Sequence, residues 1–275
     1  MPCSPPITFL SDYGDADEFV GVCHGVIARR CPTARVIDIT HGIPRHDVRA
    51  GALVLRGALA YMPAGVHLAV VDPDVGAVGP HARRAVALRS SHEGRYLVGP
   101  DNGLLSLAAE RLGDVLEAID VGSSAERLEP VSRTFHGRDI FAPVAAALAA
   151  GEPFADLGSP VPVSELRRLA LPHAAVRGGA LMAHVLRADH FGNLILDASP
   201  EQLVAAGVSL GATLSVQAAE RIHTARYAST FAEVAPGELL LYQDSLEMVA
   251  LAVNRGSAAE HLGIERDGEL VVRAA

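Results

Sequence analysis

One aspartate ends a short, wholly apolar run in the first third of the chain. The run Leu68–Val71 is followed at once by Asp72 and Pro73. A short continuous apolar run is typical of a strand buried on both faces of a parallel sheet, and proline cannot extend the hydrogen-bond ladder. Asp72 is therefore predicted at the C-terminal end of a central strand, where open α/β sheets bind ligands. A simple turn aspartate is the alternative, and this stretch alone does not choose between the two.

A second acidic segment follows the first predicted strand. Ile7–Leu10 is apolar, and Asp12, Asp15, Asp17 and Glu18 follow it before a predicted helix over 17–30. Asp17 suits the positive end of that helix. A carboxylate at the strand end, such as Asp12, is suited to accept two ribose hydroxyls. A Mg²⁺ site is the competing idea, although no phosphate-binding Gly-Lys-Ser/Thr loop accompanies it.

A histidine lies in a third dense stretch, Phe135-His136-Gly137-Arg138-Asp139. The stretch precedes a predicted helix over 144–150, and Pro143 suits a first helical turn. A lone histidine is more often structural than functional. The polar run beside a helix start makes His136 a candidate site residue.

The elements around these residues predict an α/β fold. Strands and helices alternate through the first part of the chain, which favours a mostly parallel sheet with right-handed crossovers. We expect strands over 7–10, 34–40, 66–71, 85–89 and 96–98, and helices over 17–30, 48–60, 104–111 and 144–150.

The pattern changes after residue 150. Residues 151–178 are rich in proline and glycine and predict a linker with one short helix over 164–169. Beyond it, short strands without long helices between them favour a smaller β-barrel domain. We expect these strands over 180–186, 194–196, 213–216, 239–242, 248–253 and 269–272. The predicted domains are 1–165, an α/β domain, and 166–275, a β-barrel.

Composition limits the possible partners. The chain has 275 residues, 49% of them hydrophobic, and a formal charge of −9. This charge argues against nucleic-acid binding, which needs a basic surface. Three cysteines without a C-x-x-C pair predict no disulfide framework. No signal peptide and no membrane span are expected, which predicts a cytoplasmic protein.

Six short motifs occur in an order typical of one family. They read SDYGDADEFVG (11–21), ITHGIP (39–44), VVDPDVG (70–76), GPDNGLLS (99–106), FHGRDIFAP (135–143) and DHFGN (189–193), with NRGSAA (254–259) near the end. The chain resembles the S-adenosyl-L-methionine (SAM) hydroxide adenosyltransferases, the SAM hydrolases related to fluorinase and chlorinase. The resemblance implies an N-terminal α/β domain, a C-terminal β-barrel domain and a homotrimer. It also implies metal-independent hydrolysis of SAM to adenosine and L-methionine, without a cofactor.

The resemblance also implies a catalytic set. Asp72 and His136 match the family's aspartate and histidine, which with an arginine activate the attacking water. Arg83 matches the arginine by its relation to the next strand, with Arg84 as the alternative, because the loop before it (AVGPHA) is longer than usual. Asp74 replaces the second glycine of the aspartate motif. In this interpretation His136 takes the proton of water, and Arg83 stabilises the developing hydroxide and keeps Asp72 charged.

Substrate contacts are implied in the same way. Asp12 matches a ribose ligand, Asp17 a residue near the methionine end, and His46 a position that stacks on the substrate in a relative. Further matches come from the second domain, which would reach a site in the adjoining subunit. There Asp189 and Ser245 match methionine contacts, whereas Asn193, Asn254 and Arg255 match contacts to adenine.

Three competing interpretations stay open. A halide-using relative is disfavoured, because the halogenating relatives carry tyrosine rather than Asp72 and His136 at the matching positions. The fluorinase also has serine where this chain has Gly137. A non-catalytic module that binds SAM or adenosine is the second interpretation. A metal-dependent phosphohydrolase that would use the aspartates at 12–17 is the third.

Overall fold

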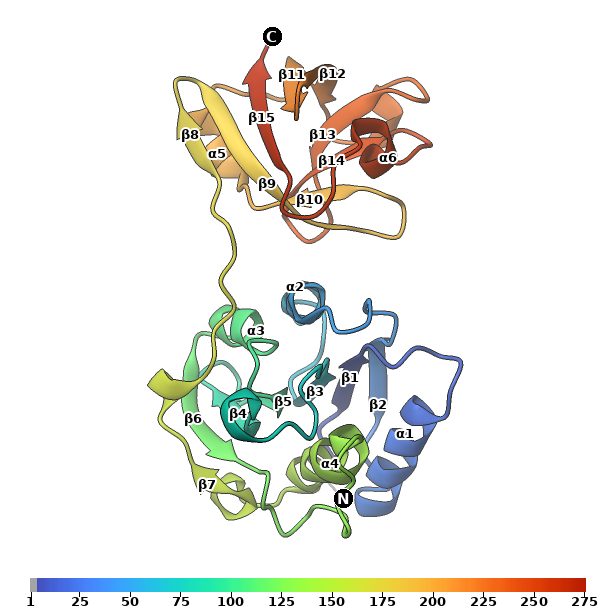
Figure 1. Cartoon of the computed structure of the whole chain (residues 1–275), viewed down its shortest axis with the longest axis vertical. Helices are drawn as coiled ribbons and strands as arrows, with labels where there is room; N and C mark the ends of the chain where they lie inside the picture. Colours follow the sequence, from blue (N-terminus) through green and yellow to red (C-terminus); the bar gives the residue numbers. More distant parts are fainter. Residues whose placement is uncertain (1–3) are drawn as a thin grey trace. The chain divides into compact units, whose positions relative to one another are not determined.

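The computed structural model describes residues 4–275, and Cys3 lies outside the described residues. The chain divides into two compact units between Leu169 and Ala170 (Figure 1). This division falls in the segment 151–178 that its proline and glycine content marked as a linker. No helix among the described residues is long and apolar enough to cross a membrane. Cys23 and Cys31 are free and buried.

The N-terminal domain is built on a seven-stranded sheet with the order β2-β1-β3-β5-β4-β6-β7. The pairings of β2, β1, β3 and β5 are parallel, and those of β4, β6 and β7 are antiparallel. Five strands therefore run in one direction, which confirms the mostly parallel sheet. The strands are β1 (Ile7–Ser11), β2 (Val36–Thr40), β3 (Val66–Val70), β4 (Ala85–Ser90), β5 (Tyr96–Pro100), β6 (Val115–Asp120) and β7 (Ser159–Pro160).

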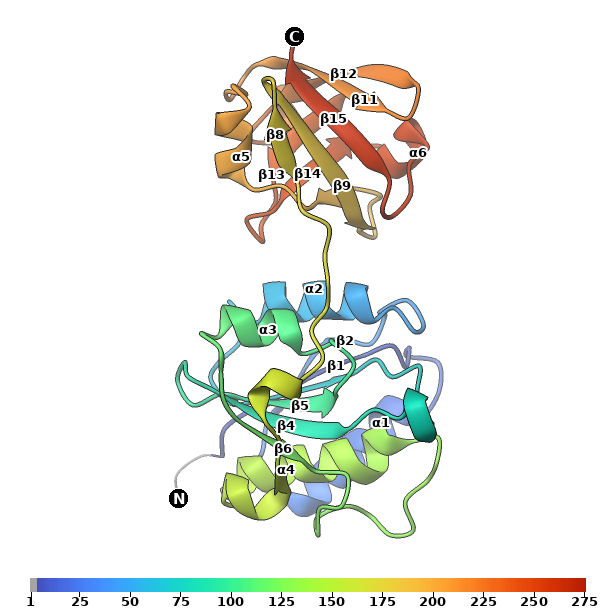
Figure 2. The same ribbon diagram turned by 60° about the vertical axis from the view of Figure 1, so that its left-hand side comes forward.

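Helices cover both faces of this sheet (Figure 2). Helices α1 (Phe19–Arg30) and α4 (Ala142–Ala150) pack together on one face, and α2 (Val48–Ala58) and α3 (Ser106–Arg111) pack together on the other. Strands β1 and β3 are buried along their whole length, as their apolar sequences predict. Both faces of the central strands are therefore shielded, and their C-terminal ends become the place where polar side chains gather.

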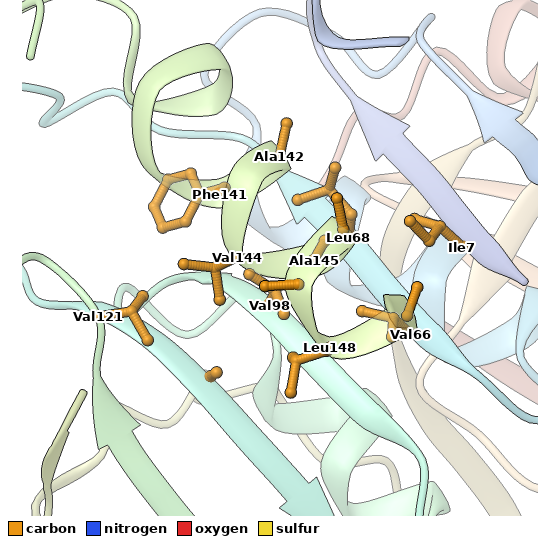
Figure 3. Packing of buried hydrophobic residues seen from close by; sticks show 14 of the residues in the cluster. Ile7, Val66, Leu68, Val98, Val121, Phe141, Ala142, Val144, Ala145 and Leu148 are labelled. Atoms are coloured by element: carbon orange, nitrogen blue, oxygen red, sulfur yellow. The ribbon is translucent and has the colours of Figure 1, made fainter. Parts of the chain in front are cut away.

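Helix α4 forms the centre of the larger hydrophobic core (Figure 3). Its sequence APVAAALAA is buried except at Ala150. The small alanine side chains let the helix lie close to the sheet, where Val144 and Leu148 meet strand residues such as Val98 and Leu68. This packing fixes the position of the segment just before α4, which carries His136.

The C-terminal domain is a closed β-barrel, which confirms the predicted class. Seven strands follow one another in the order β10-β14-β13-β12-β11-β15-β9, and the pairing of β9 with β10 closes the ring. Strand β8 adds to the outside of β9. The elements are β8 (Ala175–Arg177), β9 (Ala180–Ala188), β10 (Leu194–Leu196), α5 (Pro200–Ala205), β11 (Thr213–Ala218), β12 (Arg221–Tyr227), β13 (Leu239–Gln243), β14 (Val249–Val253), α6 (Ala258–Leu262) and β15 (Glu269–Ala274).

The helix predicted over 164–169 is wrong. Only a 3-10 turn forms there, over Val163–Glu165. The backbone N–H of Arg167 donates to Asp101 Oδ1 at 2.8 Å, and that of Leu169 donates to Ser106 Oγ at 3.1 Å. These backbone N–H groups would donate to carbonyl oxygens within a helix. Because they donate to side chains of the N-terminal domain instead, the segment stays extended.

Candidate active site

A buried ion pair lies at the C-terminal end of β3. Asp72 follows the strand by two residues, and Arg83 stands just before β4. Arg83 Nε donates to Asp72 Oδ1 at 2.9 Å and to Oδ2 at 3.1 Å, and Arg83 Nη2 also donates to Oδ2. The two side chains are only 4% and 5% exposed. A guanidinium this enclosed holds the carboxylate in one orientation and excludes most of the water around it.

The same guanidinium contacts His136. Arg83 Nη2 lies 2.8 Å from His136 Nδ1. A guanidinium can only donate, so Nδ1 accepts and carries no proton in this contact. In a neutral imidazole the proton then lies on Nε2. Burial lowers the pKa of His136, and the Arg83 cation lowers it further, whereas Asp72 and Asp139 act in the opposite direction. The geometry therefore favours a neutral His136 with an N–H at Nε2.

The position of His136 is fixed by the π-helical turn η2 (Gly137–Phe141), which leads directly into α4. Asp139 is buried in this turn, and its Oδ2 accepts from the backbone N–H of Ser132 at 2.8 Å. Arg138 Nε donates to Asp139 Oδ1 at 2.6 Å. The His-Gly-Arg-Asp run is therefore one local unit, in which Arg138 and Asp139 hold the backbone that presents His136.

The two arginines that the sequence left as alternatives point to different partners. Arg84 Nη2 donates to Glu165 Oε2 at 2.6 Å, and Arg84 Nη1 lies 3.8 Å from Asp101 Oδ2. Adjacent residues of an extended segment project to opposite sides. Arg83 is thus the arginine that the structure brings to Asp72 and His136.

A cavity of about 290 Å³ opens beside this cluster. Apart from Arg83, every site residue predicted in the N-terminal domain lines this cavity. These residues are Asp12, Asp17, His46, Asp72 and His136. The remaining wall comes from residues that the sequence did not single out, namely Tyr13, Phe19, Arg45, Val70, Val75, Thr134, Phe135 and Gly137. A cavity lined by both polar groups and aromatic rings is typical of a small-molecule site.

The loop after β1 brings Asp12 to this cavity. Asp12 Oδ2 accepts from the backbone N–H of His46 at 2.9 Å. His46 has a φ of 66°, a left-handed conformation that is uncommon outside glycine. The loop after β1 and the loop after β2 are thereby tied together, and Asp12 keeps further lone pairs for a ligand hydroxyl.

Among the cavity residues that sequence reasoning missed, Tyr13 has the most perturbed surroundings. Burial raises the pKa of its phenol well above the ordinary value, and the nearby carboxylates Asp12 and Asp72 add to this effect. A Cβ placed on Gly137 would collide with the Tyr13 hydroxyl. The glycine after His136 therefore makes room for Tyr13. Its place in SDYG, one residue after Asp12, was the signal available in the sequence.

The aspartate motif tolerates Asp74 without strain. Asp74 is absent from the described residues with positive φ, whereas Gly76 has a φ of 72°. A Cβ on Gly76 would also meet the carbonyl oxygen of Arg133. Glycine is therefore needed at position 76 and not at position 74. The end of β3 is held separately, by Asn102 Nδ2, which donates to Val71 O at 2.8 Å.

In the barrel domain, Asp189 and Asn193 close the turn between β9 and β10. Asp189 Oδ1 accepts from the backbone N–H of Asn193 at 2.9 Å, and Oδ2 accepts from Asn193 Nδ2 at 2.8 Å. Both side chains thus hold the shape of the turn. Asp189 still has lone pairs available to an ammonium group.

The remaining barrel candidates lie at the two ends of β14. Asn254 and Arg255 follow the strand, and the backbone N–H of Ala259 donates to Gly192 O at 3.0 Å, which ties this segment to the β9–β10 turn. Ser245 lies in the turn before β14. Within this domain, four of the five candidates gather at one end of β14, and Ser245 lies at the other.

The fold and the site together define a two-domain protein with an α/β domain, a closed β-barrel and a buried Asp-Arg-His cluster beside a cavity. Models of the SAM hydroxide adenosyltransferase N-terminal and C-terminal domains match residues 7–158 and 183–271. The chain belongs to the SAM hydroxide adenosyltransferase family.

The chain is similar both to proteins named as SAM hydrolases and to proteins named as fluorinases. The chain is 51% identical over 274 residues to the (R)-S-adenosyl-L-methionine hydrolase of Salinispora tropica, with 100% of both chains covered. It is 30% identical over 284 residues to a fluorinase of Actinopolyspora mzabensis, with 93% of this chain and 92% of that protein covered. The crystal structure of an uncharacterized conserved protein from Thermotoga maritima superposes with a TM-score of 0.89 at 33% identity, covering 97% of this chain and 99% of that one.

Proposed function

We propose that this protein hydrolyses SAM to adenosine and L-methionine. One observation carries the proposal, which is the buried cluster of Asp72, Arg83 and His136 beside a cavity lined by Asp12. The family and the 51% identity to a hydrolase supply the reaction. The name of that relative specifies the (R) configuration at sulfur, so the substrate epimer is part of the question.

The reaction is a displacement at the ribose C5′ carbon. An oxygen–carbon bond forms as the carbon–sulfur bond breaks, and the electron pair leaves with sulfur to give neutral methionine. A sulfonium leaving group needs neither a general acid nor a Lewis acid. The site has to hold one water molecule in line behind C5′, and positioning of this kind supplies up to roughly 7–11 kcal/mol.

On the basis of the Arg83 contact we infer a role for His136 that differs from the general-base role predicted from the sequence. The Nδ1 lone pair of His136 already accepts from Arg83, so it is not free to take a proton from water. The Nε2 proton is instead available to donate to the water oxygen. Asp72 is then the acceptor of a water hydrogen through Oδ1, which receives one contact from Arg83 and keeps a second lone pair, whereas Oδ2 receives two. The proton released from the attacking water passes to Asp72 and from there to solvent.

The substrate contacts form part of the same proposal. Asp12 binds the ribose hydroxyls, Asp17 lies toward the methionine end, and His46 packs on the substrate. The proposed contacts from a neighbouring subunit are Asp189 and Ser245 to methionine, and Asn193, Asn254 and Arg255 to adenine.

We propose a homotrimer in which each site takes residues from two subunits. The mixing of two inactive variants tests this. Chains with Asp72→Asn and chains with Asn254→Ala, unfolded and refolded together, should regain part of the activity that neither has alone. No regain, in mixtures whose mass corresponds to a trimer, would contradict a site shared between subunits.

The activity is tested by incubating purified protein with each SAM epimer in EDTA, with and without chloride. Adenosine and methionine in both buffers are expected. EDTA-insensitive turnover would support a reaction without a metal. We also propose that the protein works in the cytoplasm, where SAM is available. Appearance of 5′-chloro-5′-deoxyadenosine would favour the halide-using alternative. Bound SAM without any product would favour the binding module.

A further inference from the structure

A cluster separate from the cavity brings together His24, Asp38 and His41. One ligand-type atom from each residue lies within 4.8 Å of the other two. His24 comes from α1, Asp38 from the edge strand β2, and His41 from the residue directly after β2. None of the three lines the cavity beside Asp72. We infer that this cluster is a binding site for a divalent transition-metal ion, with Zn²⁺ as the ion that fits its ligands best.

Both imidazoles converge on the same carboxylate oxygen. His24 Nε2 lies 2.9 Å and His41 Nε2 lies 3.2 Å from Asp38 Oδ1. Two ligands on a tetrahedral Zn²⁺, each about 2.0–2.1 Å from the ion, are separated by roughly 3.3 Å. The two spacings to Asp38 Oδ1 are close to this value, and the two imidazole nitrogens lie within 4.8 Å of each other. A shared ion would require the side chains to adjust around it.

His41 is the observation that points to a ligand. It is 6% exposed, and its Nε2 atom makes no hydrogen bond with the described residues, because its 3.2 Å contact with Asp38 Oδ1 lacks hydrogen-bond geometry. A buried polar atom in a native fold is nearly always satisfied. A metal ion would satisfy the nitrogen and use the carboxylate that already faces it.

The second ring nitrogen of His41 has the partner expected for a metal ligand. His41 Nδ1 lies 2.7 Å from Ser11 Oγ. Metal-binding histidines usually donate their second ring N–H to an oxygen acceptor, which fixes the tautomer and aims the free nitrogen at the metal. Phe9 packs against both imidazoles, at ring-centroid distances of 6.1 Å to His24 and 4.7 Å to His41, and supplies an apolar wall.

Two imidazoles and one carboxylate suit Zn²⁺, with a fourth position open to water. The site would join the middle of α1 to the end of β2. It also lies behind the loop that carries Asp12, because Ser11 contacts His41 and the backbone N–H of Gly14 donates to His41 O at 2.8 Å. A bound ion would therefore stabilise the loop without taking part in the reaction, and this inference does not depend on the proposed hydrolysis.

Zinc binding to the full chain tests the inference. Metal-free protein, prepared with a chelator and dialysed, is titrated with Zn²⁺ and monitored by calorimetry and thermal unfolding. We expect one Zn²⁺ per chain and a higher unfolding temperature. His24→Ala and Asp38→Asn, which change half-exposed side chains, should weaken binding about 100-fold or more, and Ser11→Ala by about 10- to 100-fold. The matched control is His92→Ala, which removes an exposed histidine beside Glu93 and should bind like the parent.

Two results would overturn the inference. One is the absence of measurable zinc binding to the parent chain. The second is binding that persists unchanged in both His24→Ala and Asp38→Asn, which would assign the ion to different groups such as the cysteines.

Discussion

Replacement of Asp72 by asparagine tests how much the buried pair with Arg83 supports the fold and the reaction. The change keeps the shape of the side chain and removes its charge. Three donor contacts from Arg83 end on the carboxylate, and neither side chain has enough exposure for water to replace them. The asparagine amide also turns a donor toward a guanidinium that can only donate.

The expected loss of unfolding free energy follows from leaving the charge of Arg83 buried and unpaired. Removal of one partner of such a pair costs about 3–5 kcal/mol. For a domain of this size the loss lowers the unfolding temperature by roughly 6–20 °C. Activity should fall about 10²- to 10⁴-fold, as expected when a proton acceptor and its alignment are lost.

The double variant Asp72→Asn with Arg83→Met separates stability from catalysis. It removes both charges, so most of the lost stability should return, whereas hydrolysis should stay at the level of the single variant. Denaturant unfolding and product chromatography measure the two effects. A single variant that unfolds within about 1 kcal/mol of the parent, or that turns over within tenfold of it, would refute this reasoning.

Three further predictions concern pH and packing. Because burial and Arg83 lower the pKa of His136 below its ordinary 6.5, activity should persist as pH falls through 6.5 and decline only below it. A pH–rate midpoint above 6.5 would contradict this assignment. Gly137→Ala should cost about 1–3 kcal/mol of unfolding free energy and weaken substrate binding, and Tyr13→Phe in the same chain should restore part of both losses, since it removes the hydroxyl that the new Cβ meets. Burial lowers the pKa of His67 to about 3, so the unfolded chain takes up this proton near pH 6.5 and the folded chain does not. Stability from His67 is thus complete above pH 6.5 and should fall by about 3 kcal/mol by pH 4.5, a loss that His67→Leu should lack in denaturant titrations.

Sequence reasoning worked best where chemistry coincides with the end of a buried strand. The apolar runs before Asp12 and Asp72 are β1 and β3, and their parallel pairing brings both carboxylates to one edge of the sheet. Distances between these residues were not predictable, because they depend on loops. The longer loop before Arg83 left two arginines possible, and only the side-chain contacts separate them.

Elements without an apolar pattern were missed. Strand β12 is mostly exposed, and β6 has two exposed residues in its first half, so neither shows the alternation that predicts a strand. Both are held by backbone pairing with their neighbours in the sheet. The closure of the barrel by β9 and β10 is also a tertiary property.

The cluster of His24, Asp38 and His41 had no sequence signal. Its members come from a helix, a strand and a loop, with spacing that matches no metal-binding motif. Asp38 and His41 are three residues apart at the end of β2, and only the packing of α1 brings His24 to them. The same holds for the contact between Tyr13 and Gly137, which lie far apart in the chain.

The most direct test of the central claim is hydrolysis in ¹⁸O-labelled water. Displacement by water at C5′ places the label on the 5′ oxygen of adenosine, and mass spectrometry should find it there and not in methionine. Asp72→Asn should form labelled adenosine at a much lower rate. Unlabelled adenosine, or label in homoserine formed together with methylthioadenosine, would contradict attack by water at C5′.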